Sequence, residues 1–143
     1  MDSLFWSKVH GGTTHFPIAL LIASALFDLA GYALNREPHS RDLHAASFYA
    51  LLLGALASFA AVLSGLIITH WETLGGGQLG KHHLYVWPGF ALLVGLAVWR
   101  LVVRGQASRR AFGIYLGVLI VTAVLMTAAG YWGGEMMLGG AGA

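Results

Sequence analysis

The sequence predicts an all-α integral membrane protein: a single four-helix up-down bundle with both termini outside. Of its 143 residues, 57% are hydrophobic and only 10% are charged, whereas about 25% of a typical soluble domain is charged. Four long stretches almost lack acidic and basic residues, and each reaches the roughly 20 residues that an α-helix needs to cross a bilayer. This composition excludes a soluble globular domain and a disordered chain. The length fits one transmembrane domain over residues 1–143.

The four stretches predict helices over about 15–34, 43–71, 83–103 and 110–134. Pro17 suits the first turn of the first helix, and the segment 35–38 ends it. Three glycines at 75–77 follow the second helix, Pro88 lies early in the third, and the segment 104–106 separates the third from the fourth. Because these connections are short, consecutive helices are expected to be antiparallel neighbours.

The basic residues predict the orientation in the membrane. Six of the eight lie at one end of the predicted bundle, namely Arg36, Arg41, Arg100, Arg104, Arg109 and Arg110. Lys8 and Lys81 lie at the opposite end, with both termini. Because positive charge stays on the cytoplasmic side, both termini are expected outside. These arginines set topology, so no nucleic-acid partner is predicted, and the absence of cysteine excludes thiolate metal sites and thiol catalysis.

Histidines gather at the predicted outer end. Five of the seven are placed there, namely His10, His15, His70, His82 and His83. The first two precede or open the first helix, His70 closes the second, and the last two open the third. Segments far apart in the sequence thus deliver imidazoles to one depth of the membrane. Imidazole binds haem iron, copper and zinc and also carries protons, so this convergence is the main functional signal.

The leading hypothesis is a b-type cytochrome or haem-binding electron-transfer subunit. A haem held by two histidines needs one from each of two facing helices at similar height. His15 and His83 are the predicted axial ligands, with His10, His70 and His82 as the reserve set. Electrons would pass between an external donor and the quinone pool. The alternatives are a copper or zinc site for transport or sensing, built from three or four imidazoles, and a structural anchor with interfacial histidines. His39 and His44, at the inner end, have no clear helical partner.

Two carboxylates are further candidate functional residues. Asp28 lies in the inner half of the first helix, where a carboxylate is costly and usually has a partner or a function. We expect a structural pair with Arg100 or Arg104; the functional alternative is a proton relay. Glu135, at the outer end of the fourth helix, is expected to pair with Lys8 or Lys81, to orient a histidine, or to accept a proton from a quinol.

Small residues mark two helix faces. A seam on the second helix is formed by Ser47, Gly54, Ser58, Ala61 and Gly65. Gly113 and Gly117 form a second small pair on the fourth helix, which permits a homodimer. Such residues let helix backbones approach closely, and plain helix packing explains them. The functional alternative is room for a flat cofactor.

Two motifs resemble a known family. The run HGGTTHFPIAL over residues 10–20, followed by Leu26–Phe27–Asp28, is similar to the opening signature of a bacterial family of four-helix predicted inner-membrane proteins of unknown function. The family also has a histidine at the start of its third helix, matched by His82 or His83. Its closing motif is matched by Gly130, Tyr131, Gly133, Gly134 and Glu135. The resemblance covers essentially the whole chain.

The resemblance implies a multi-pass location in the bacterial inner (cytoplasmic) membrane. Because related domains occur joined or adjacent to exported dehydrogenases and cytochrome c domains, it also implies membrane electron transfer. The partner would be a periplasmic oxidoreductase or cytochrome c. Two departures affect this comparison. Gly11 stands where the family commonly has proline, and the tail after Glu135 is short, so the resemblance assigns that tail no role.

Overall fold

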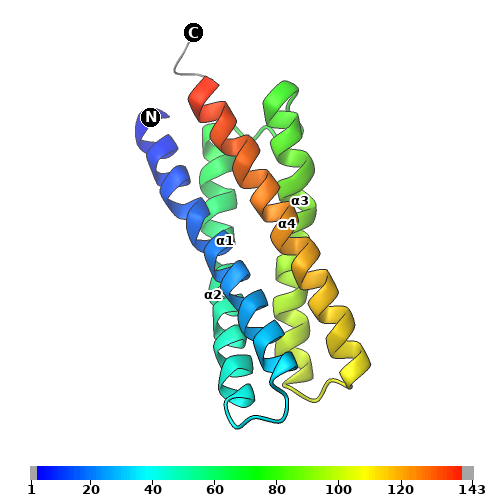
Figure 1. The fold of residues 1–143 in the computed structure, drawn as a ribbon. Helices are drawn as coiled ribbons and strands as arrows, with labels where there is room; N and C mark the ends of the chain where they lie inside the picture. The colour runs from blue at the N-terminus through cyan, green and yellow to red at the C-terminus, as the bar shows by residue number, and fades with distance from the viewer. Residues whose placement is uncertain (1–2, 140–143) are drawn as a thin grey trace.

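Four long α-helices make up the chain in a computed structural model, which describes residues 3–139. They are α1 (Ser3–Ala33), α2 (Ser40–Ile68), α3 (Gly77–Val103) and α4 (Arg109–Gly139). Consecutive helices run in opposite directions in one bundle (Figure 1). The predicted all-α four-helix class is therefore confirmed.

The bundle has two distinct ends (Figure 1). The start of α1, the end of α4 and the α2–α3 connection lie at one of them, which we call the histidine end because it carries His10, His15, His70, His82 and His83. The α1–α2 and α3–α4 connections lie at the other, which we call the arginine end because it carries Arg36, Arg41, Arg100, Arg104, Arg109 and Arg110.

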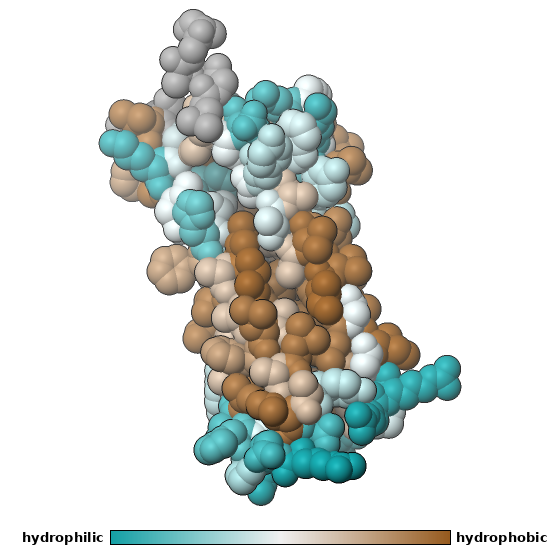
Figure 2. All heavy atoms as spheres, viewed as in Figure 1, coloured by the Kyte–Doolittle hydropathy of each residue, from teal (hydrophilic) through white to brown (hydrophobic). Residues whose placement is uncertain are grey.

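The surface matches a membrane environment. Each helix contains a segment long and apolar enough to cross a membrane: Leu4–Ala33, Ser40–Ile68, Gly77–Val103 and Arg109–Met137. Large apolar side chains are exposed on all four helices, among them Phe16, Leu56, Leu84 and Val124. Figure 2 shows, on the face drawn, an apolar belt across the middle of the bundle with hydrophilic groups at both ends. These are the features of a multi-pass membrane protein.

All four helices extend beyond a predicted limit, and α2 does so at its start, at Ser40 instead of about 43. α1 begins at Ser3 instead of about 15, α3 at Gly77 instead of about 83, and α4 continues to Gly139 instead of about 134. Pro17 therefore lies in the interior of α1 and not in its first turn. Proline is tolerated inside membrane helices because neighbouring groups and local adjustments satisfy the backbone atoms that it frees. α2 ends at Ile68, three residues before the predicted limit.

The core has one fully buried leucine from each helix, namely Leu21, Leu51, Leu93 and Leu119. The closest packing is within the antiparallel pairs α1–α2 and α3–α4. At Gly54 of α2, an added Cβ would lie 3.3 Å from Leu20 Cβ and 3.5 Å from the Pro17 carbonyl oxygen, so glycine permits this close approach. The predicted seam on α2 is thus confirmed as a packing face against α1. Gly113 and Gly117 instead face open space, so that pair has no role in packing within the described chain.

Candidate functional site

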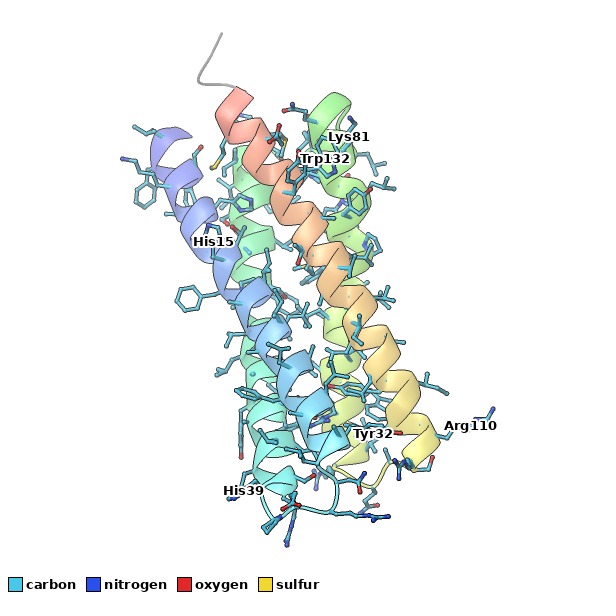
Figure 3. All side chains as sticks on the ribbon, in the orientation of Figure 1. His15, Tyr32, His39, Lys81, Arg110 and Trp132 are labelled. Atoms are coloured by element: carbon cyan, nitrogen blue, oxygen red, sulfur yellow. The ribbon has the colours of Figure 1, made fainter. Side chains whose placement is uncertain are left out.

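The two histidines of α1 lie on different sides of the helix. His10 faces α2, where its Nδ1 is 3.0 Å from the Ala61 carbonyl oxygen and 3.0 Å from Ser64 Oγ. His15 follows five residues later, which turns it about 140° around an α-helix, and its side chain is exposed (Figure 3). The expectation that His10 and His15 precede or open the helix is wrong, because both lie inside α1. His10 reaches the bundle as a helical residue and not through a folded-back loop.

His82 and His83 of α3 both point toward protein. The Nδ1 atom of His82 is 2.8 Å from the Ala129 carbonyl oxygen of α4. His83 is only 8% exposed, and its ring centroid lies 5.8 Å from that of His82 and 5.9 Å from that of Trp87. Its buried Nδ1 has no hydrogen-bond partner among the described residues. His83 is therefore a buried imidazole with an unused polar atom.

Three of the five predicted histidines converge. His10 and His82 are close enough across the bundle to interact electrostatically, and His82 interacts in the same way with His83. His70 lies beyond the end of α2 and is exposed, as is His15. In the described chain, neither His15 nor His70 makes a ring contact or hydrogen bond with another histidine. The structure thus brings together His10, His82 and His83, whereas the exposed His15 contacts no other histidine among the described residues.

The hydrogen bonds of His10 and His82 define which ring nitrogen carries the proton. A carbonyl oxygen can only accept, so each Nδ1 donates its proton, to Ala61 in one case and to Ala129 in the other. The lone pair of each Nε2 is then available, and neither Nε2 forms a hydrogen bond within residues 3–139. Histidines that bind metals characteristically donate their other ring N–H to a backbone carbonyl or carboxylate. Both residues therefore have the tautomer and support that an imidazole ligand requires.

The predicted ion pair of Glu135 with a lysine is not formed at the histidine end within residues 3–139. Lys81 Nζ lies 4.3 Å from the centroid of the Trp132 ring (Figure 3), which is a cation–π contact. Among the described residues, Glu135 forms no ion pair with Lys8 or Lys81, and its side chain is half-buried. The same described region contains no group of three or more histidine, aspartate or glutamate side chains placed to hold a metal ion.

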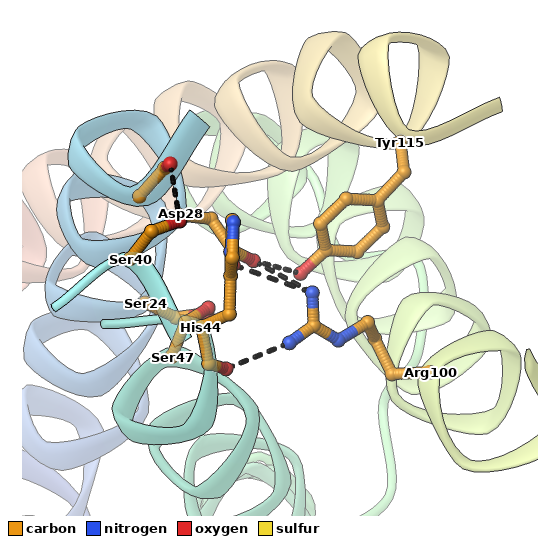
Figure 4. A network of polar contacts seen from close by, with 8 residues as sticks. Ser24, Asp28, Ser40, His44, Ser47, Arg100 and Tyr115 are labelled. Carbon is orange, nitrogen blue, oxygen red and sulfur yellow. Dashed lines mark hydrogen bonds and ion pairs between the residues drawn. The ribbon is translucent and has the colours of Figure 1, made fainter. Parts of the chain in front are cut away.

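A second polar cluster lies near the arginine end, and it uses one residue from each helix (Figure 4). Asp28 of α1 is fully buried. Its Oδ2 accepts from Arg100 Nη1 of α3 at 3.0 Å and from the Tyr115 hydroxyl of α4 at 2.9 Å, and its Oδ1 lies 2.7 Å from His44 Nδ1 of α2. Arg100 Nη2 also donates to the His44 carbonyl oxygen at 2.9 Å. We call Asp28, His44, Arg100 and Tyr115 the Asp28 network.

The network resolves two sequence predictions. The pairing of Asp28 with an arginine is confirmed, and the partner is Arg100 and not Arg104. The interpretation that His44 has no helical partner is wrong, because the α1–α2 turn places it opposite Asp28. His39 is exposed, 4.0 Å from the Asp42 carboxylate, which is also exposed. Sequence reasoning missed Tyr115 altogether, although its ring is stacked on Trp99 and covered by Arg100.

One comparison with known proteins identifies a family. The model of a family described as "Predicted membrane protein (DUF2231)" matches residues 7–141, which is nearly the whole chain. No match was found among curated proteins or among solved structures. The match agrees with the four apolar helices of the fold.

Proposed function

The chain belongs to the DUF2231 family of predicted membrane proteins, and we propose that it is a b-type, haem-binding electron-transfer protein of the bacterial inner membrane. One observation carries the proposal. His10 of α1 and His82 of α3 each donate Nδ1–H to a backbone carbonyl and leave Nε2 free, at the same end of the bundle. The proposed axial ligands are these two residues of the predicted reserve set, in place of His15 and His83.

The number of available imidazoles favours haem over a bare metal ion. The haem macrocycle supplies four ligands to iron, so two protein side chains complete the site. A copper or zinc ion takes three or four protein ligands. His10 and His82 meet the smaller requirement from opposite sides of the bundle. The buried Nδ1 of His83 adds a polar atom that a bound group would satisfy.

The surrounding residues fix the proposed ligands. Ala61 and Ala129 hold the two rings through backbone oxygens, which do not change protonation state, so the Nε2 lone pairs stay directed by the helices themselves. Gly65 and Gly133 leave room for the rings, since an added Cβ would lie 3.0 Å from His10 Cε1 at the first and 3.4 Å from His82 at the second.

Electron transfer is the chemistry that this site would serve. Bound haem supplies one-electron transfer at its iron, tuned by axial ligands and burial. The partners we propose are a periplasmic oxidoreductase or cytochrome c and the membrane quinone pool, because the histidine end is the outer end under the positive-inside rule. Glu135, half-buried and outside any ion pair of the described chain, is the carboxylate at this end suited to accept a proton from a quinol.

Optical spectroscopy of purified protein tests the proposal. The protein would be produced with added haem precursor, and its dithionite-reduced spectrum should show the sharp bands of a bis-histidine haem. His10→Ala and His82→Ala should each abolish haem retention. His15→Ala and His70→Ala are matched controls, because they remove exposed histidines of the same end, and they should retain haem. Size-exclusion profiles of all four variants would establish that they fold.

Other outcomes point to the alternatives. A colourless protein with stoichiometric copper or zinc by elemental analysis would replace haem with a metal-ion site. A sample without any cofactor would favour the structural anchor. Haem that survives both His10→Ala and His82→Ala, yet is lost in His15→Ala, would return the ligand role to the pair predicted from the sequence.

A further inference from the structure

A pocket opens at the arginine end, between residues of all four helices. Its volume is about 420 Å³. Three of the side chains that line it are aromatic and three are arginines, namely Tyr32, Trp99, Phe112, Arg41, Arg100 and Arg109. It is at the opposite end of the bundle from His10, His82 and His83 (Figure 1), although His44 of the Asp28 network also lines it, and the proposed haem site does not use it.

The charge of the pocket is positive and uncompensated. No acidic side chain lines it. Asp28, buried behind it, balances the charge of Arg100, but Arg41 and Arg109 form no ion pair within the described chain. Arg109 is nevertheless held at the wall, because its Nε donates to the Tyr32 hydroxyl at 3.3 Å and its guanidinium lies 5.1 Å from the centroid of the Tyr32 ring. The pocket therefore presents two cationic side chains with no anionic partner.

The helix dipoles of α2 and α4 do not favour these two arginines. Arg41 is in the first turn of α2 and Arg109 is the first residue of α4, where the helix dipole disfavours positive charge. Membrane topology requires arginine at this end, and Arg36, Arg41, Arg109 and Arg110 are all exposed there, so any of them can meet that requirement. Topology does not explain why Arg41 and Arg109 line one pocket. An anion bound between them would be attracted by both guanidinium groups and by both helix dipoles.

The position of the pocket at the edge of the apolar belt indicates which kind of anion would bind there. Hydrophilic residues of this end border the apolar belt directly (Figure 2), so a ligand here meets water on one side and hydrocarbon on the other. Phospholipids have this division, with a phosphate group that guanidinium binds in a bidentate manner and acyl chains that continue along the apolar surface. A neutral quinone ring would fit the aromatic walls but would leave the two charges unpaired.

We propose that this pocket binds the phosphate group of an anionic phospholipid, with Arg41 and Arg109 as the recognising side chains. Free phosphate carries the same oxyanion as the phospholipid headgroup, so the two arginines could bind either. The lipid is favoured because the pocket adjoins the membrane belt. This site is independent of the proposed function, since neither arginine contacts the histidine end.

The test compares two double variants of equal charge change. Arg41→Gln/Arg109→Gln removes the two unpaired charges of the pocket, whereas Arg36→Gln/Arg110→Gln removes two arginines of the same end that are equally classed as exposed but do not line the pocket. Figure 3 shows Arg110 pointing away from the bundle. Delipidated protein in neutral detergent would be mixed with phosphatidylglycerol, phosphatidylcholine or inorganic phosphate, and bound adducts counted by native mass spectrometry. Thermal unfolding would verify that both variants fold.

The wild-type protein and the Arg36/Arg110 variant should bind phosphatidylglycerol at least tenfold more tightly than phosphatidylcholine. The Arg41/Arg109 variant should lose that preference. An equal loss in both double variants would overturn the proposal, because surface charge alone would then explain binding. Inorganic phosphate that competes with the lipid at equal concentration would overturn the lipid assignment in favour of a free anion.

Discussion

The two ends of the bundle bury polar side chains in opposite ways. Near the arginine end, both carboxylate oxygens of Asp28 are used, by partners from the three other helices. At the histidine end, His83 has a buried Nδ1 without a partner in the described chain, and the hydrogen bonds of His10 and His82 there use Nδ1 and leave Nε2 unused. Buried polar groups in folded proteins are almost always hydrogen-bonded. The closed network thus indicates a structural role, and the open one supports the ligand site that we propose.

The closed network also fits the physics of a membrane bundle. Lipid tails are as apolar as leucine, so helix association in a bilayer rests on packing and on polar contacts between helices. Asp28 contacts one residue on each other helix, and Arg100 adds a bond to the His44 backbone. These directional contacts fix the depth of the helices relative to one another. The Asp28 network therefore specifies their register.

The largest expected effect comes from breaking this network at its centre. Arg100→Leu leaves the Asp28 carboxylate buried without its cation, and we expect a loss of about 3–5 kcal/mol in unfolding free energy. The measurement is equilibrium unfolding in mixed micelles. Asp42→Asn is the control, because the Asp42 side chain is 86% exposed, and its effect should stay below about 0.5 kcal/mol.

A second variant separates charge burial from general damage. Asp28→Asn/Arg100→Leu removes both charges and keeps an amide oxygen that can accept from Tyr115. The double variant should be more stable than Arg100→Leu alone. If its destabilisation equals the sum of the two single effects, the ion pair is not the source of the stability.

A smaller effect is expected from Tyr115→Phe. This change deletes one hydroxyl that donates to Asp28 at 2.9 Å and leaves the ring on Trp99. Hydrogen bonds to charged groups contribute about 1.5–3 kcal/mol, so unfolding free energy should fall by that amount. Tyr131→Phe, at an exposed tyrosine, should have almost no effect. Equal losses in both variants would mean that the bond to Asp28 contributes nothing specific.

The sequence predicted the contacts of the arginine end better than those of the histidine end. The apolar runs predicted four helices and their directions, and the rule against intramembrane carboxylates predicted the pairing of Asp28 with an arginine. The limits of α1 were missed because residues 3–14 contain glycine, lysine and histidine and do not look like a membrane span. That error affected the choice of ligand residues. A loop would let His10 and His15 approach one ligand, whereas a helix separates them by about 140° around its axis.

The partner of His44 was available from the sequence. In an antiparallel pair, residues equally far from the turn lie at the same depth. The contacts Ser24–Ser47, Asp28–His44 and Gly31–Ser40 all have their midpoint near residue 36. Locating the centre of the turn would have found His44. No comparable rule separates His82 from His83, because adjacent helical residues differ by about 100° and only the packing against α4 shows that the His82 ring reaches the Ala129 carbonyl oxygen.

The smallest expected effect tests the open end directly. His83→Leu replaces a buried imidazole that has an unsatisfied Nδ1, and removal of an unpaired buried polar group is neutral or stabilising. We expect the apoprotein to unfold with unchanged free energy or with a gain of up to about 1 kcal/mol. His44→Leu, the matched substitution near the other end, deletes a bond to Asp28 and should destabilise by about 1–2 kcal/mol.

The test is the difference in unfolding free energy between His83→Leu and His44→Leu. It compares the same chemical change at a satisfied and at an unsatisfied imidazole of one bundle, so effects of side-chain size and helix propensity largely cancel. If His83→Leu destabilises the apoprotein as much as His44→Leu does, His83 has a partner of its own in the membrane. The histidine end would then be a closed network like the arginine end, and the physical reason for placing a ligand there would be lost.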